Sequence, residues 1–202
     1  MDTHPARAVA VIALPLGLGC VRDVRLDSPS LRSFDPRLDH RIGVYVSPAA
    51  RSHVATSQGL LQYRVLFGQA LGDKAAFAYL HAFTRVELVD DFPPTAPDAP
   101  RLVFGIEIVR SFVHPARSTL EPWSADITLQ AQLAVNGEIQ PEPLEARAKH
   151  VIRSRTAAVF SGESESAYPA VDACTGALAD APNVLVDASR LRVEALERAT
   201  TR

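Results

Sequence analysis

The sequence predicts an α+β fold, in which an antiparallel sheet of about four to five strands carries helices packed on one face. Two patterns and one bulk property lead to this two-layer sandwich. Several segments after residue 41 alternate apolar and polar residues, as half-buried strands do, and others repeat apolar residues at helical spacing. The chain has 202 residues, 47% of them hydrophobic, which is enough to bury one core without a metal or a disulfide framework.

The first predicted elements are a strand, a helix and a second strand. In RIGVYVSP (41–48) the isoleucine and the valines lie on one face, and the proline ends the strand. Residues 63–83 place apolar side chains near helical spacing, although Gly68 and Gly72 each weaken a helix by about 1 kcal/mol. These glycines either let another segment pack closely or are merely tolerated. FTRVELVD (83–90) then predicts a short strand.

The central part of the chain predicts two long strands and a hairpin, after a proline-rich loop at 90–100. RLVFGIEIVRSFV (101–113) and WSADITLQAQLAV (123–135) both alternate, with one face in the core and the other in water. Asn136-Gly137 predicts a tight turn, and the return strand begins near Leu144. The core side chains predicted for the two strands include Ile106, Ile108, Phe112, Ile127, Leu129 and Leu133, whereas Ser111 is predicted on the wet face.

The C-terminal part predicts two helices separated by Pro182. The segment 166–181 contains Cys174, which is most simply a small buried side chain, although a disulfide with Cys20 is possible. The segment 183–199 forms the second helix. Its apolar stripe, expected to face the sheet, consists of Val184, Ala188, Leu191 and Ala195.

The first twenty residues predict a secretion signal. Residues 8–18 form an uncharged apolar stretch of eleven residues, which is the length of a signal-peptide core and too short for a transmembrane helix of about 20 residues. A dinucleotide-binding glycine turn is excluded because Arg22 stands where a third glycine is needed. A buried first strand stays possible, although Pro15 would interrupt its hydrogen bonds.

Gly19-Cys20, at the end of this stretch, resembles the lipobox of bacterial lipoproteins. The resemblance implies cleavage before Cys20, a lipid on its sulfur and an acylated amino terminus, which together anchor a chain stably in a membrane. Residues 1–19 are then a signal peptide, residues 20–40 a solvated tether rich in charge, serine and proline, and residues 41–202 a single domain. Val21 after the cysteine resembles an outer-membrane sorting signal, which implies the periplasmic side of that membrane.

The order of elements behind this signal is similar to that of a group of bacterial envelope lipoproteins. RIGVYVSP, YLHAFTRVEL, the strand pair VFGIEIVRSF and ADITLQAQLAV, and the alanine-rich last helix resemble the auxiliary lipoproteins of ABC-type lipid-transport systems. Lipopolysaccharide-assembly and YajG-type lipoproteins share this pattern. The resemblance covers most of the chain after His40. It implies an accessory or scaffolding subunit of an envelope lipid-transport complex, and the alternative is an adaptor for peptidoglycan synthesis or an appendage.

The sequence contains no recognisable catalytic or metal-binding motif. Its six histidines lack metal-ligand spacing, and nucleophile-elbow and phosphate-loop motifs are absent. Asp90 and Asp91 point to opposite sides of an extended chain, so they are read as part of a solvated loop. The formal net charge of -2 argues against nucleic-acid binding. We therefore expect a binding protein without cofactor, metal or nucleic acid, with an enzyme as a third possibility because catalytic residues can assemble from distant positions.

One predicted strand, EARAKHVIRSR (145–155), carries a basic stripe. Its members are Arg147, Lys149, Arg153 and Arg155. The stripe is either a contact for anionic lipid headgroups or an acidic partner, or a solvated strand face whose charge prevents aggregation. These four residues and the lipid attachment site Cys20 are the candidate functional residues.

Overall fold

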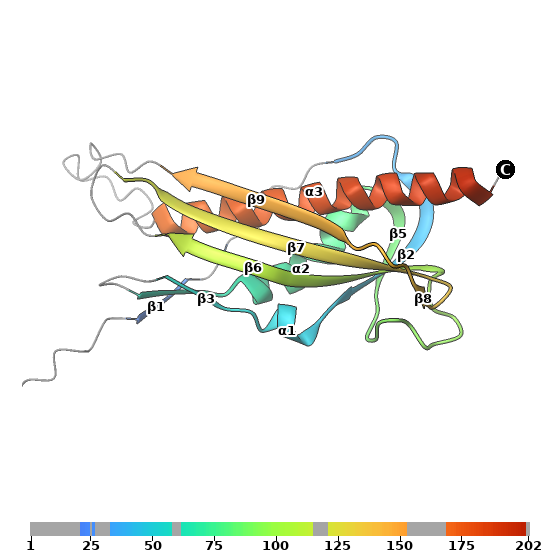
Figure 1. The fold of residues 1–202 in the computed structure, drawn as a ribbon, viewed down its shortest axis with the longest axis horizontal. Coiled ribbons are helices and arrows are strands. Elements are labelled where there is room, and N and C mark those ends of the chain that lie inside the picture. The colour runs from blue at the N-terminus through green and yellow to red at the C-terminus, as the bar shows by residue number, and fades with distance from the viewer. Residues whose placement is uncertain are drawn as a thin grey trace, which may run out of the picture.

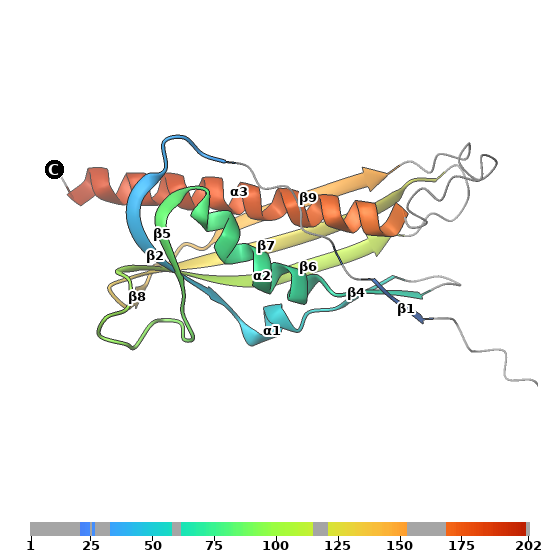
Figure 2. The ribbon, with the colours of Figure 1, turned by 180° about the vertical axis from the view of Figure 1, so that it is seen from behind.

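The computed structural model describes residues 21–24, 26, 33–57, 62–114, 121–152 and 169–200. Their strands are β1 (Val21–Val24), β2 (Leu38–Val46), β3 (Ala55–Thr56), β4 (Gln62–Val65), β5 (Phe83–Leu88), β6 (Leu102–His114), β7 (Trp123–Val135), β8 (Glu138–Ile139) and β9 (Leu144–Ile152). Their helices are α1 (Pro48–Arg51), α2 (Phe67–Leu80) and α3 (Pro169–Thr200). Figure 1 shows the sheet with α3 behind it, and Figure 2 shows these layers from the other side. The fold is α+β, as predicted.

The main sheet is mixed, and in the described part of the chain it has six strands. Its order is β5-β2-β6-β7-β8, and β9 also pairs with β7. Both β5 and β6 run parallel to β2, whereas β7 is antiparallel to its neighbours. The prediction of a purely antiparallel sheet with four to five strands is wrong because two crossovers return the chain in the same direction. One crossover contains α2, and the other is the loop at 89–101.

A second, smaller sheet has the order β1-β4-β3 within the described residues. β1 pairs in parallel with β4, with Val21 opposite Gln62 and Val24 opposite Val65. The segment predicted as a tether (20–40) therefore begins with a strand, and from Leu38 onward it belongs to β2. Four residues are too few to show a period, so this strand is recognisable only from its pairing with a distant segment.

Helix α2 starts later than predicted because the first residues of the segment 63–83 form β4. The close packing of α1 on α2 depends on Gly68, since a Cβ there would overlap the carbonyl oxygen of Ala50. A Cβ at Gly72 would meet only Arg51 Cγ, at 3.6 Å. Gly68 is therefore needed for the close packing of α1 on α2, whereas Gly72 is merely tolerated.

The two predicted C-terminal helices are one continuous helix, α3, with Pro182 inside it. Packing along β7 and β9 holds the helix together across the proline, and Asn183 Nδ2 donates to the carbonyl oxygen of Ala179 at 2.9 Å. The predicted apolar stripe does not face the sheet, because Val184 is 45% and Leu191 63% exposed. The buried face is formed instead by other residues of the helix, including Leu178, Leu185, Val186 and Val193.

The core lies between the main sheet and the helices. Tyr79 of α2 packs against Phe104 of β6, with ring centroids 5.3 Å apart, and its hydroxyl lies 2.8 Å from Oγ of Ser189 on α3. Five of the core residues predicted for β6 and β7 are confirmed: Ile106, Ile127, Leu129 and Leu133 are at most 1% exposed, and Ile108 is partly buried against them.

The hairpin predicted at Asn136-Gly137 is confirmed. Both residues have positive φ, 52° and 82°, as a type I′ turn requires. β8 follows directly and pairs with the end of β7, with Glu138 opposite Val135. β9 begins at Leu144, as predicted.

Candidate binding surface on the open face of the sheet

A β-bulge in β6 decides which side chains reach the face of the sheet opposite α3. The pairing of β6 with β7 shifts between Ile108 and Arg110, and such a shift changes the alternation of faces. Ser111 is thereby turned inward, where its Oγ lies 2.7 Å from Nε2 of His53, and Phe112 is turned outward and is 41% exposed. The predictions of a core Phe112 and a wet Ser111 are wrong for this reason.

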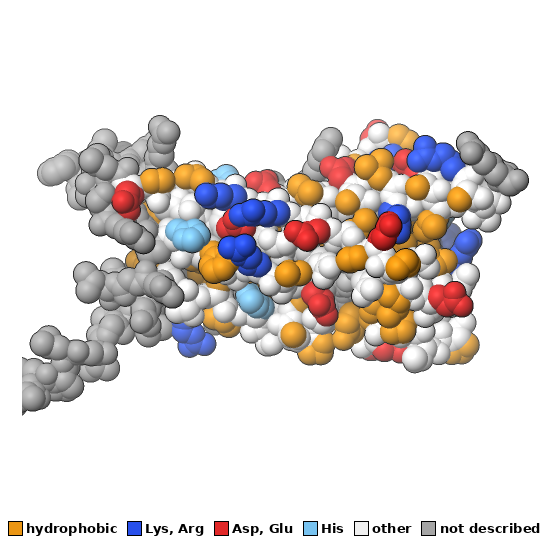
Figure 3. Space-filling model, viewed as in Figure 1, with side chains coloured by type: hydrophobic (Ala, Val, Ile, Leu, Met, Phe, Trp, Pro, Cys, Tyr) orange, Lys and Arg blue, Asp and Glu red, His pale blue; other side chains and the backbone are white. Residues whose placement is uncertain are grey.

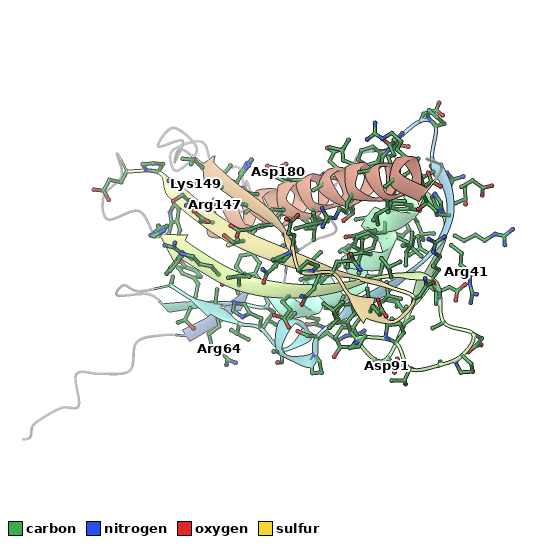
Figure 4. The ribbon with its side chains drawn as sticks, turned by 45° about the vertical axis from the view of Figure 1, so that its right-hand side comes forward. Arg41, Arg64, Asp91, Arg147, Lys149 and Asp180 are labelled. Carbon is green, nitrogen blue, oxygen red and sulfur yellow. The ribbon has the colours of Figure 1, made fainter. Side chains whose placement is uncertain are left out.

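The open face carries a group of cationic and aromatic side chains near the ends of β6 and β9. The strand register aligns three rows across β6, β7 and β9, which are Arg110–Thr128–Arg147, Phe112–Asp126–Lys149 and His114–Ser124–Val151. We call these nine residues the open-face array. Figure 3 shows lysine and arginine side chains gathered on this face around an acidic one, and Figure 4 shows Arg147 and Lys149 close together on β9.

Asp126 lies at the centre of the array and is only 5% exposed. Arg147 Nε donates to both of its carboxylate oxygens at 3.2 Å. This hydrogen bonding, together with the charges of Arg147, Arg110 and Lys149, holds the pKa of Asp126 below its ordinary value. The carboxylate therefore stays ionised at neutral pH, and the array keeps three cations against one anion.

Apolar and aromatic groups lie beside these cations. The guanidinium carbon of Arg110 is 4.4 Å from the ring centroid of Phe112, a cation–π distance. The Phe112 ring stacks on His114 with centroids 5.9 Å apart. Val109 in the bulge is 57% exposed, and Val151 at the end of β9 is 46% exposed. Cations interleaved with exposed apolar groups are typical of surfaces that contact membrane interfaces or binding partners.

The positive charge is confined to one end of the open face. The next aligned row is Glu107–Gln130–Glu145, which is acidic at both edges. Beyond it, Phe92 of the loop between β5 and β6 lies over Gly105, where a Cβ would come within 2.8 Å of the ring. The open face is therefore basic near the ends of β6 and β9 and acidic or aromatic toward its middle.

Of the predicted site residues, the structure places Arg147 and Lys149 on this open face, two positions apart on β9. Arg153, Arg155 and Cys20 lie outside the described residues. Sequence reasoning missed Arg110, Phe112 and Asp126, because the bulge in β6 and the register between strands are not local properties. Arg110, Phe112 and His114 alternate along β6, and this alternation would have indicated the site only if the position of the bulge had been known.

The described residues contain no group of three or more His, Cys, Asp or Glu side chains able to hold a metal ion. The His53–Ser111 pair resembles a base and a hydroxyl nucleophile. Burial lowers the pKa of His53, and Ser111 is partly buried in the sheet.

Among the residues that the structure describes, no helix has the length and apolar character needed to cross a bilayer.

Comparison with solved structures finds the same fold in another bacterial protein. Protein XCC0632 from Xanthomonas campestris, of the DUF330 family, superposes with a TM-score of 0.58 over 88% of this chain and 98% of its own, at 12% identity. The likeness shows the fold. At this identity it carries no statement about activity.

Two further structures match at lower similarity. A minor lipoprotein from Acinetobacter baumannii has a TM-score of 0.40 and 13% identity, over 76% of this chain and 96% of its own. The hypothetical protein CT253 from Chlamydia trachomatis has a TM-score of 0.35 and 10% identity over the same shares. These values are too low to support an argument. No protein-family model and no curated protein sequence matches the chain.

Proposed function

We propose that this protein is a lipid-anchored accessory subunit of an ABC-type envelope lipid-transport system, held on the periplasmic side of the outer membrane through Cys20. In this role the open-face array contacts anionic lipid headgroups. The observation that carries the proposal is the array itself, with three cations around one buried carboxylate and exposed apolar groups beside them.

The placement of the array supports a contact with the membrane that holds the anchor. β1 begins at Val21, the residue after Cys20, so acyl chains on Cys20 would lie next to the smaller sheet. In Figure 1, β1 lies at the same end of the molecule as the last residues of β6 and β9. An anchored molecule would therefore bring its basic end toward the bilayer and keep the acidic row farther away.

The energetics of such a contact are those of a polybasic surface. Each lysine or arginine near an anionic membrane contributes about 1 kcal/mol, and the contribution falls off within a Debye length. Exposed Phe112 and Val151 add apolar surface that can enter the headgroup region. The cations carry most of the attraction, because two exposed side chains bury little area.

The first test measures flotation of the chain from residue 21 onward, without its lipid, on vesicles of phosphatidylcholine with or without phosphatidylglycerol. We expect binding to the anionic vesicles alone, and weaker binding in high salt. The double reversal Arg110→Glu and Lys149→Glu should abolish flotation. The matched control is Arg85→Glu and Arg101→Glu, which changes net charge equally at exposed sites outside the array and should keep flotation. Equal flotation of both double variants would contradict the headgroup contact.

A second test addresses the transport role. The full-length protein, purified from detergent-solubilised membranes, should bring with it an ABC-type ATPase and a lipid-binding subunit. Recovery of a cell-wall synthase or appendage subunits instead would favour the adaptor role. Loss of either partner in the Arg110→Glu and Lys149→Glu variant, with vesicle flotation intact, would mean that the array binds an acidic protein.

A further inference from the structure

Helix α3 carries an apolar stripe on the side turned away from the sheet. The stripe consists of Val184, Ala188, Leu191 and Ala195, spaced by four, three and four residues. Val184 is 45% and Leu191 63% exposed, and Ala195 is exposed as well. Figures 1 and 2 show α3 as a long helix that lies along the back of the sheet. Within the described part of the chain, these four side chains therefore form a largely exposed apolar face over about 16 Å of helix, in which Ala188 is partly buried.

The spacing of the stripe is that of a coiled-coil seam. Alternating steps of three and four residues keep apolar side chains on the line where two helices meet. The core face of the same helix, with Leu178, Leu185 and Val193, is turned about a third of the way around the helix from the stripe on average. α3 thus has one apolar face packed on its own sheet and a second one suited to another helix.

The charges beside the stripe indicate which helix fits. Asp180, Asp187 and Glu194 recur every seven residues along one flank, which is the spacing of one flanking position of the seam. Within the chain, Asp180 also lies 3.8 Å from Nδ1 of His150 on β9, and Glu194 accepts a hydrogen bond from Arg190 at 3.2 Å. Arg192 lies on the other flank and donates to Glu142 at 3.2 Å. An antiparallel copy of α3 would bring two acidic rows together, whereas a parallel copy places each acidic row beside the other copy's Arg192 flank.

We propose that the stripe docks a second copy of this chain, with the two α3 helices parallel. In this pair each seam residue meets its own counterpart, and the small Ala188 and Ala195 let the helices approach closely. Both copies then have β1 at the same end, which agrees with two anchors in one membrane but does not depend on them. Because four side chains bury little area, the pair is weak in dilute solution and gains from a high local concentration.

The test is oxidative crosslinking of the full-length chain in intact cells that express it, where its local concentration is not diluted. Leu191→Cys should form a disulfide-linked dimer, because position 191 meets position 191 in a parallel pair. The wild type, with Cys20 and Cys174, sets the background, and burial raises the pKa of the Cys174 thiol to about 12, so it is poorly reactive. Phe77→Cys is the matched control, since Phe77 is 55% exposed on a different helix, α2, and this variant should stay monomeric.

A second pair of variants fixes the orientation. A mixture of Ala188→Cys and Leu191→Cys chains should give the two homotypic dimers and little 188–191 product. Predominance of the 188–191 product would establish an antiparallel pair and overturn the proposal. Crosslinking of Leu191→Cys no greater than that of Phe77→Cys would show that no second copy docks there. Neither result would affect vesicle flotation, so the docking proposal and the proposed function are tested independently of each other.

Discussion

At the scale of single residues, Asp126 holds the array together. It receives the hydrogen bonds of Arg147 while nearly buried, and it offsets the repulsion among three cations that the register brings close. Burying a carboxylate is costly unless it is paired, so the burial of this one is explained by its partners. We therefore expect the loss of the Asp126 carboxylate to destabilise the array more than the loss of any other member.

We predict that Asp126→Asn lowers the free energy of unfolding at pH 7 by about 1–3 kcal/mol, because Arg147 loses a charged acceptor. The lowered pKa of Asp126 means that its contribution is complete above the unfolded pKa of about 3.9 and is lost as pH falls through the folded value. Urea unfolding at pH 7 and at acid pH checks this. The difference between variant and wild type should shrink in acid. Exposed Glu138→Gln is the control, and an equal effect there would refute the assignment.

At the scale of elements, the sequence allows the alternating strands and the turn between them to be predicted, because these signals are local. Leu129 is buried and its neighbour Gln130 lies on the open face, as the alternation requires. The bulge at Val109 is different: nothing in the local pattern distinguishes it, and it reverses the faces of Ser111 and Phe112. The stripe on α3 was predicted as a real apolar face but assigned to the wrong side, since a helix with two apolar faces gives no local sign of which one packs on the sheet.

The glycines of α2 provide an element-scale prediction. Gly68→Ala should destabilise the fold by about 1–3 kcal/mol, because the added methyl group collides with the backbone of α1. Gly72→Ala should stabilise it by up to about 1 kcal/mol, because its Cβ has room and alanine is the better helix former. Thermal unfolding of both variants checks the pair. Similar effects at the two positions would mean that α1 does not pack on α2 as described.

At the scale of the whole molecule, local patterns predict the α+β class but not the mixed sheet, because strand direction is set by crossovers between distant segments. The array has the same origin: its residues come from three strands and are neighbours only through register. Two of its cations, Arg147 and Lys149, could be found from the sequence because they lie two apart on one strand. Arg110 and Asp126 could not be, since their proximity depends on tertiary pairing.

The proposed orientation on the membrane depends on the lipid at Cys20, because the anchor sets which end of the molecule, and with it the array, faces the bilayer. The most direct measurement is the intact mass of the protein isolated from the membrane fraction of cells. For the wild type, we predict a chain that lacks residues 1–19 and carries acyl chains on Cys20. For Cys20→Ser, we predict an unprocessed chain that keeps residues 1–19 and carries no acyl chains. A wild-type mass that retains residues 1–19 and contains no acyl groups would contradict the anchored role.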